Sequence, residues 1–223
     1  MSFNIISTLN QKIEKFRISV NLIGRFNIYN LLALSLTLLL DSYSLSEIVQ
    51  ILPKLLSAKG RMEIVKFKPT VIVDYAHTPD ALYNTLYTLR NLLKSSNISK
   101  LYLVFGCGGN RDQSKRNIMY NIAKQYADYV IITSDNPRYE KPLDIIAHML
   151  TNKNNNTSYE DNKNSNCNYE IIVDRCLAIT TALNLATIND VVLIAGKGHE
   201  LYQEINGIKH FFSDFDVIKK YYS

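Results

Sequence analysis

From about residue 64 onward, short apolar runs alternate with longer segments whose apolar residues recur every three or four positions. The apolar runs cover residues 70–75, 100–106, 129–134, 169–174 and 190–196. The segments with helical spacing cover residues 79–93, 114–127, 142–150 and 175–186. Strands that are apolar along their whole length and alternate with helices predict βαβ units and a parallel sheet covered on both faces. We therefore expect an α/β fold with a mostly parallel sheet, and residues 201–222 add a predicted hairpin and a short helix.

Residues 1–58 have a different pattern, which predicts a short strand or coil followed by helices. The stretch NIYNLLALSLTLLL, residues 27–40, is apolar on most sides and predicts a largely buried helix. Residues 44–56 predict a second helix, with Ser44 or Ser46 as its N-cap. Gly60 interrupts the pattern, so we expect a helical segment over residues 1–58 and an α/β domain over residues 59–223.

Residues 151–168 depart from both patterns, because eight of these eighteen residues are asparagine. Such a low-complexity segment has little apolar surface to bury. It predicts a mobile insertion in the α/β domain.

Composition narrows the classes of function. The 223 residues carry a net charge of +5, and no Lys/Arg block with interleaved aromatic residues favours a nucleic-acid partner. The three cysteines and four histidines lack the spacing of a metal site, and Cys107 is expected to be a packed small residue. The start of the chain does not resemble a signal peptide, and the apolar run 31–40 is about half as long as a membrane span. We expect a cytoplasmic protein without membrane insertion.

Polar and charged residues follow four of the predicted strands, in segments 74–78, 106–112, 135–138 and 196–200. In open parallel sheets, ligands bind at the carboxyl ends of the strands. Seven of the eight glycines lie at four places in the sequence, three of them in GCGG, where the backbone must turn or approach a ligand closely. The sequence thus predicts a ligand site built from these four segments.

The segment GCGGNRD is neither a P-loop nor a dinucleotide fingerprint, and no G-x-x-x-x-G-K-[ST] motif occurs in the sequence. Arg111 in this segment is suited to bidentate binding of a carboxylate or phosphate. In VDYAHTP, Asp74 is a candidate acceptor for a ribose hydroxyl, His77 a candidate contact to a base or phosphate, and Thr78 a helix N-cap. On chemistry alone, these residues predict a polar site with arginines for an anionic or zwitterionic molecule.

Six segments in order resemble the Mur ligase family, and most closely its diaminopimelate-adding members. They are GRFNIYN, GRMEIV, VDYAHTPDAL, VFGCGGNRDQSKR, TSDNPRYEKP and VVLIAGKGHELYQ. The resemblance implies that residues 1–58 are a remnant of the family's central ATPase domain, and that residues 59–223 are its Rossmann-like C-terminal domain. The family's P-loop and carboxylated lysine have no counterpart in this sequence. No catalytic residue is therefore assigned to the chain.

The resemblance also implies roles for particular residues. Those matching the family's diaminopimelate contacts are Arg111, Asp135, Asn136, Pro137, Arg138, Gly196 and Glu200. Those matching or lying near its nucleotide contacts are Asn27, Asn30, Arg61, Asp74 and His77. A planar guanidinium suits the distal carboxylate that distinguishes diaminopimelate from lysine, so Arg138 is the expected specificity residue. Glu200 is expected to accept the distal ammonium.

The implied reaction uses ATP and Mg²⁺ to join meso-diaminopimelate to UDP-MurNAc-L-Ala-D-Glu. Because the P-loop is missing from the sequence, we expect a truncated or split ligase that needs a separate N-terminal ligase fragment. Three alternatives stay open: a non-catalytic diaminopimelate-binding module, a decaying gene product, and another amide ligase such as a lysine-adding Mur ligase or a folylpolyglutamate synthase.

Overall fold

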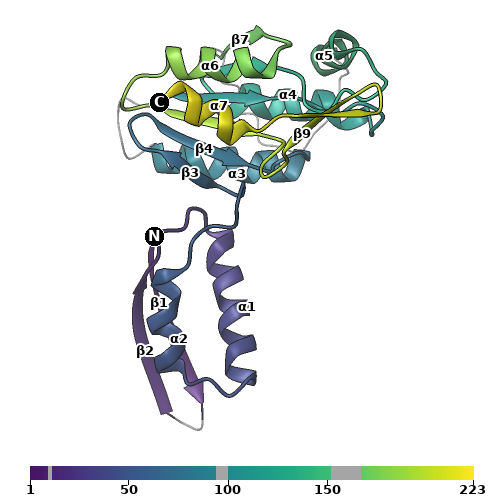
Figure 1. Cartoon of the computed structure of the whole chain (residues 1–223). Coiled ribbons are helices and arrows are strands. Elements are labelled where there is room, and N and C mark those ends of the chain that lie inside the picture. The colour runs from purple at the N-terminus through teal and green to yellow at the C-terminus, as the bar shows by residue number, and fades with distance from the viewer. Residues whose placement is uncertain (10–11, 94–99, 152–166) are drawn as a thin grey trace. The chain divides into compact units, whose positions relative to one another are not determined.

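The computed structural model describes residues 1–9, 12–93, 100–151 and 167–223. These residues form two compact units, unit 1 from Met1 to Ala58 and unit 2 from Lys59 to Ser223 (Figure 1). The predicted Asn-rich insertion falls almost entirely outside the described residues. No helix in the described ranges combines the length and apolar character needed to cross a membrane.

Unit 1 begins with an antiparallel hairpin. Strand β1 (Ser2–Leu9) pairs with β2 (Lys12–Ser19), and Ser2 lies opposite Ser19. The expectation of a short strand or coil is therefore wrong here. The missed signal is a period of two, since Phe3, Ile5, Phe16 and Ile18 all pack into one core.

Two helices follow the hairpin, α1 (Phe26–Leu40) and α2 (Leu45–Ile51), with the short 3-10 helix η1 (Leu52–Lys54) after them. Ser44 is the N-cap of α2 and forms a capping box with Glu47, as its sequence position predicts. The helix predicted to run to residue 56 ends at Ile51 and continues as η1, which contains Pro53.

The prediction that the apolar helix is largely buried is wrong within unit 1. In α1 only Leu31 and Ser35 are buried, whereas Leu36 and Leu40 are 54% and 86% exposed. The reason is that one face of α1 packs into the small core of this unit. That core consists of Ile18, Val20, Leu22, Leu31, Ile48 and Leu52.

Unit 2 contains a six-stranded sheet in the order β3-β4-β8-β5-β6-β7. Its strands are β3 (Glu63–Lys66), β4 (Thr70–Asp74), β5 (Leu101–Phe105), β6 (Tyr129–Ile132), β7 (Asn168–Ile171) and β8 (Val191–Ala195). All neighbours pair in parallel except β3 and β4, which are antiparallel. The predicted α/β class with a mostly parallel sheet is confirmed. Edge strand β7 is exposed rather than buried on both faces.

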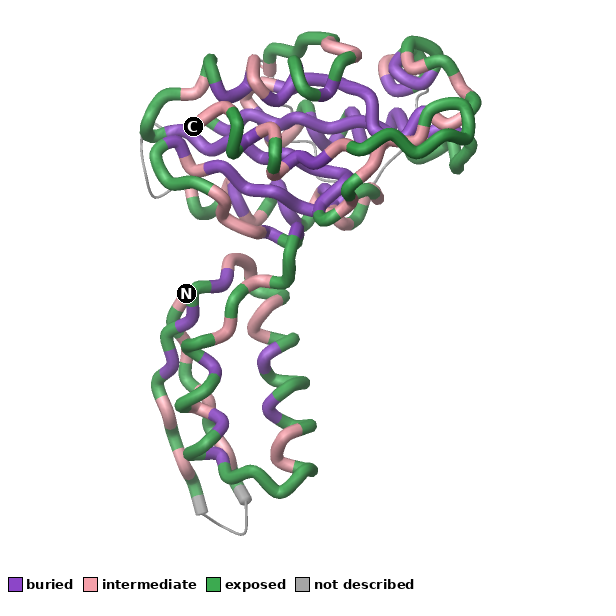
Figure 2. Tube along the Cα trace, in the orientation of Figure 1, coloured by how far each residue is buried: buried purple, intermediate pink, exposed green. Residues whose placement is uncertain are grey.

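Helices cover the sheet (Figure 1). They are α3 (Pro79–Leu93), α4 (Ser114–Tyr126), α5 (Pro142–Leu150), α6 (Arg175–Leu185) and α7 (Asp214–Tyr221). Helices α6 and α7 contact each other, and their residues Ala178, Ile179 and Ile218 share a core with alternate residues of the central strands. Helix α4 contacts both α3 and α5. Figure 2 shows the central strands of unit 2 as its buried layer.

A second hairpin, β9 (Tyr202–Ile205) and β10 (Ile208–Phe211), connects the last sheet strand to α7. This confirms the predicted hairpin and short helix at the end of the sequence. Ser213 caps α7 by accepting a hydrogen bond from the Asp216 backbone N–H.

Candidate functional site

The loops after β4, β5, β6 and β8 meet at one edge of the sheet, because these four strands are parallel neighbours. The Gly109 backbone N–H donates to the Asn136 carbonyl at 2.9 Å, and that of Gly196 donates to the Asp74 carbonyl at 3.1 Å. The structure therefore brings together the four polar segments singled out in the sequence. The ligand roles of their residues stay predictions.

Glycine permits these loops to touch backbone against backbone. A Cβ on Gly109 would collide with the carbonyl of Pro137, and a Cβ on Gly60 would collide with the backbone of Gly198 and His199. A Cβ on Gly196 would make only ordinary contacts, at 3.7 Å to Asp135 Oδ1 and 3.9 Å to the Gly106 carbonyl, but its φ of +113° is a conformation that side-chain-bearing residues rarely adopt.

Asp135, Asn136, Lys197 and Glu200 form one connected group, which we name the Lys197 cluster. The Lys197 Nζ donates to Asn136 Oδ1 at 3.0 Å and to Glu200 Oε2 at 3.1 Å. Asn136 Nδ2 donates to the same Glu200 oxygen at 2.9 Å. Lys197 lies 3.7 Å from Asp135 Oδ1, which is close enough for charge attraction but too long for a hydrogen bond.

Arg138 lies beside this cluster and adopts a left-handed conformation with φ of +52°. Its Nε donates to Glu204 Oε2 at 3.1 Å, and its Nη1 donates to the Gly109 carbonyl at 2.8 Å. Its neighbour Pro137 accepts a backbone hydrogen bond from Glu140 at 3.0 Å. In the described part of the chain, Arg138 Nη2 has no hydrogen-bonding partner.

Gly108 marks the point where both arginines and the acid converge. A Cβ on Gly108 would lie 3.1 Å from Arg138 Nη1, 3.5 Å from Arg111 Cγ and 3.7 Å from Asp135 Oδ2. Arg111 is exposed and has no ion pair within the described ranges. The stem of Arg111 thus lies near Gly108, and its charge has no partner among the described side chains.

Two buried arginines that support these loops, Arg116 and Arg175, are not predicted by the sequence analysis. Arg116 forms a two-pronged ion pair with Glu140, at 2.8 Å on each side, and donates to the Gly108 carbonyl at 3.2 Å. The hydrogen bonds from Arg116 lower the pKa of Glu140 below its ordinary value. Glu140 also accepts from the Asn110 backbone N–H. Arg116 and its partner Glu140 therefore hold the backbone of the glycine-rich segment 106–112 through Gly108 and Asn110.

Arg175, at the start of α6, lies under the loop that follows β8. Its Nε and Nη2 donate to the two oxygens of Asp214 at 2.8 and 2.9 Å, and Nη2 also donates to the Ala195 carbonyl at 3.0 Å. Burial alone would lower the pKa of Arg175, but the charge and hydrogen bonds of Asp214 outweigh it and raise that pKa. No local motif signals this pair, because the partners are 39 positions apart.

The predicted nucleotide contacts in unit 2 lie around Tyr75. The exposed Arg61 guanidinium lies 5.2 Å from the centre of the Tyr75 ring, and the His77 and His199 rings lie 4.6 and 5.3 Å from it. The Asp74 carboxylate is buried and accepts from the backbone N–H groups of Met62 and Ala76.

The surroundings of Asp74 and Thr78 show how this loop is held. Burial raises the pKa of Asp74, although the hydrogen bonds from Met62 and Ala76 oppose that effect. Thr78 Oγ1 accepts from the Ala81 backbone N–H at 3.3 Å, as predicted for a helix N-cap. Asp74 therefore orders the loop from within, and a ribose contact stays a prediction.

Asn27 and Asn30 belong to unit 1. Asn27 Nδ2 donates to the Ile23 carbonyl at 2.7 Å, and Asn30 Nδ2 donates to Asn27 Oδ1 at 3.2 Å. Each amide thus has a local partner at the start of α1, and their predicted place near an adenine is untested.

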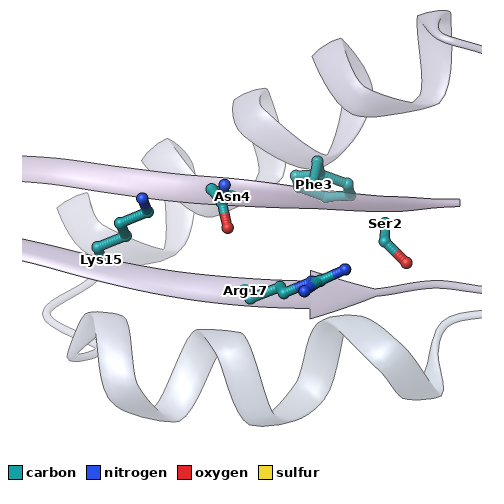
Figure 3. Close-up of a pocket in the computed structure, with 5 residues that line it drawn as sticks. All are labelled: Ser2, Phe3, Asn4, Lys15 and Arg17. Carbon is teal, nitrogen blue, oxygen red and sulfur yellow. The ribbon is translucent and has the colours of Figure 1, made fainter.

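Unit 1 also carries a depression of about 540 Å³ on its hairpin (Figure 3). Residues Ser2, Phe3 and Asn4 of β1 and Lys15 and Arg17 of β2 line it. None of them is a predicted site residue. Cys107 in unit 2 is buried, as expected of a packed small residue, and burial raises its pKa to about 12. The described residues contain no group of three or more His, Cys, Asp or Glu side chains able to hold a metal ion.

Comparisons with known proteins agree with this arrangement. Residues 60–198 match the family described as Mur ligase, glutamate ligase domain. The chain is 44% identical to the UDP-N-acetylmuramoyl-L-alanyl-D-glutamate--2,6-diaminopimelate ligase of Neisseria meningitidis serogroup A, over 88% of this chain and 38% of that protein. It is also 44% identical to the ligase of the same name from Cytophaga hutchinsonii, over 97% of this chain and 43% of that protein.

A solved structure of an enzyme with that name superposes with a TM-score of 0.65 at 39% identity, covering 99% of this chain and 42% of the other. The chain thus spans about two-fifths of the length of the curated relatives named above. The family match extends from Gly60 to Gly198 and includes the segments 74–78, 106–112 and 135–138 and the start of the segment 196–200. By sequence, by fold and by the loops that meet at the sheet edge, this chain belongs to the Mur ligase family.

Proposed function

We propose that this chain is the amino-acid-binding part of an ATP-dependent ligase that adds meso-diaminopimelate to UDP-MurNAc-L-Ala-D-Glu during peptidoglycan precursor synthesis. The observation that carries the proposal is the convergence of Arg138, Arg111 and Asp135 around Gly108, with Asp135 linked to the rest of the Lys197 cluster. The 44% identity to diaminopimelate ligases supports the choice of substrate.

Diaminopimelate carries an ammonium and a carboxylate at each end, so its recognition needs both acids and fixed cations. Arg138 would bind the distal carboxylate through its unoccupied Nη2, and Arg111 would supply a second guanidinium. The Asp135 carboxylate and the Glu200 oxygen that does not contact Lys197 would accept from the ammonium groups. A lysine ligand would leave Arg138 without an anionic partner.

Arg61, Tyr75 and His77 fit a nucleotide, because an exposed cation and an imidazole lie beside an aromatic ring. ATP, when bound, would supply the phosphoryl group that activates the γ-carboxylate of the D-glutamate. The residues of this chain would then hold the α-amine of diaminopimelate toward that activated carboxyl. The described residues offer no ligand set for Mg²⁺, so we assign none of them to the metal.

Unit 1 is proposed to be the end of the family's central domain, and unit 2 its C-terminal domain. The sequence contains no P-loop, so turnover is proposed to require an ATP-binding part supplied elsewhere in the protein or by a separate chain. Adding a P-loop-bearing ligase fragment in trans should give ligation if this chain is one half of an enzyme. A pure diaminopimelate-binding module would stay inactive in that assay.

Calorimetric titration of the 223-residue chain with meso-diaminopimelate and with L-lysine tests the substrate assignment. We expect measurable binding of diaminopimelate and at least about tenfold weaker binding of lysine, which corresponds to about 1.4 kcal/mol. A preference for lysine would refute the assignment.

A further inference from the structure

Lys197 is buried, with 0% of its surface exposed, although it carries a charge. Burying an ammonium group is unfavourable unless charged and hydrogen-bonding partners surround it. Three side chains do so here, those of Asp135, Asn136 and Glu200, and the centre of the Tyr202 ring lies 5.6 Å away. All three polar partners are predicted diaminopimelate contacts, whereas Lys197 itself was not assigned to the site.

The contacts of Lys197 fix how these partners are presented. Asn136 Oδ1 accepts hydrogen bonds from Lys197 Nζ and from the Glu204 backbone N–H, both at 3.0 Å. Because these donors fix the oxygen side of the amide, Asn136 Nδ2 points to Glu200. Asp135 Oδ1 is buried and faces Lys197, while Asp135 Oδ2 lies 3.7 Å from the Cβ position of Gly108. Glu200 meets Lys197 and Asn136 through the same oxygen, Oε2, which leaves Oε1 for another partner.

The charges of the site also depend on Lys197. Three cations and three acids lie around Gly108, in the Lys197 cluster or in the ion pair of Arg138, so the group is formally neutral. They are Arg111, Arg138, Lys197, Asp135, Glu200 and Glu204. Diaminopimelate has no net charge at neutral pH, whereas lysine has one net positive charge. Loss of the Lys197 charge would leave an acidic site, which would favour lysine relative to diaminopimelate.

We propose that Lys197 is a positioning residue that sets the orientation of Asp135, Asn136 and Glu200 and keeps the site neutral for a net-neutral diamino diacid. This rests on the proposed function for the identity of the ligand. The orientation of Asn136 does not depend on it.

The first experiment compares Lys197→Met with Lys209→Met in the full chain. Lys209 is the matched control, because its Nζ lies 4.3 Å from the centre of the same Tyr202 ring but on the exposed strand β10. Calorimetry with meso-diaminopimelate and L-lysine should show that Lys197→Met lowers the affinity ratio of diaminopimelate to lysine at least about tenfold. Lys209→Met should leave it unchanged. An unchanged ratio in folded Lys197→Met would overturn the proposal.

Two further measurements keep the test decisive. If circular dichroism shows that Lys197→Met is unfolded, Lys197→Gln replaces it, because an amide can still donate to Asn136 Oδ1 but carries no charge. The affinity ratio of diaminopimelate to lysine must then fall at least several-fold in Lys197→Gln. The side-chain amide signals of Asn136 in a ¹H–¹⁵N spectrum test positioning without any ligand. They should shift in the Lys197 variant and not in Lys209→Met. If the wild type binds no diaminopimelate, the proposed function fails, while these signals still decide the positioning role.

Discussion

Arg138 is held against Glu204 by side chain and backbone together. Its Nε donates to Glu204 Oε2 at 3.1 Å, and its backbone N–H donates to the Glu204 carbonyl at 2.9 Å. A parallel bridge between Arg138 and Ile205 continues this contact onto the β9–β10 hairpin. Arg138, the predicted specificity residue, is thus held by contacts with a hairpin that lies more than sixty positions later in the sequence.

Replacing Arg138 by lysine should separate charge from geometry. Arg138→Lys keeps the positive charge but loses the planar fork that reaches Glu204, Gly109 and a ligand at the same time. We expect diaminopimelate affinity to fall at least about tenfold while lysine affinity stays the same, because only diaminopimelate carries the distal carboxylate. Arg17→Lys on the exposed face of β2 serves as the control. Equal binding of diaminopimelate by both variants would contradict the specificity role.

Gly109 should not tolerate a side chain. In Gly109→Ala the new Cβ collides with the Pro137 carbonyl, so the segments 106–112 and 135–138 must move apart. We expect diaminopimelate binding to be lost and the melting temperature to fall. Gly108→Ala is the neighbouring control, since the three atoms nearest to its Cβ are side-chain atoms at 3.1 Å or more and not backbone atoms. The two variants should differ in thermal denaturation, and an equal effect would show that the close approach is unimportant.

The ion pair between Arg175 and Asp214 should dominate the stability of α7 on the sheet. Both side chains are 0% exposed, and Asp214→Asn leaves a buried guanidinium without its counter-charge. The expected loss is about 3 kcal/mol or more in the free energy of unfolding. Asp216→Asn removes an exposed acid from the same helical turn, and should cost less than about 1 kcal/mol. Urea denaturation followed by circular dichroism measures both, and a small loss in Asp214→Asn would refute the assignment.

Glu140 should contribute to stability in a pH-dependent manner. The hydrogen bonds from Arg116 hold its pKa below the ordinary 4.5 in the folded state. Ionised Glu140 therefore stabilises the fold above pH 4.5, and this contribution is lost as the pH falls through the folded-state pKa. Glu140→Gln should be about 2 kcal/mol less stable at pH 7.

The difference between wild type and Glu140→Gln should shrink as the pH is lowered from 4.5. Urea unfolding of both proteins between pH 3 and 7 tests this. A difference that stays constant over the whole range would show that the ion pair with Arg116 does not control the pKa of Glu140.

The sequence by itself determined most elements of unit 2, although not β3, and the position of the four polar segments at the ends of strands. Helices α3 and α5 start at Pro79 and Pro142 and keep their predicted bounds, because proline is tolerated in a first turn and apolar spacing defines the buried face. Four of the five apolar runs became the central strands β4, β5, β6 and β8, and the polar segments that follow them became neighbouring loops. Topology alone requires this, since parallel strands end at the same edge.

The tertiary structure decided which apolar residues are buried and which charged residues pair, because neither depends on local sequence alone. The apolar pattern of α1 predicts a buried helix. The exposure of a helix depends on what packs against it, and only one face of α1 has a packing partner within unit 1. The links from Arg138 to Glu204, from Lys197 to Asn136 and from Arg175 to Asp214 join residues 39 to 66 positions apart. A charge pattern along the chain cannot specify such partners. They exist because the strand order places those loops side by side and because a buried charge requires a counter-charge.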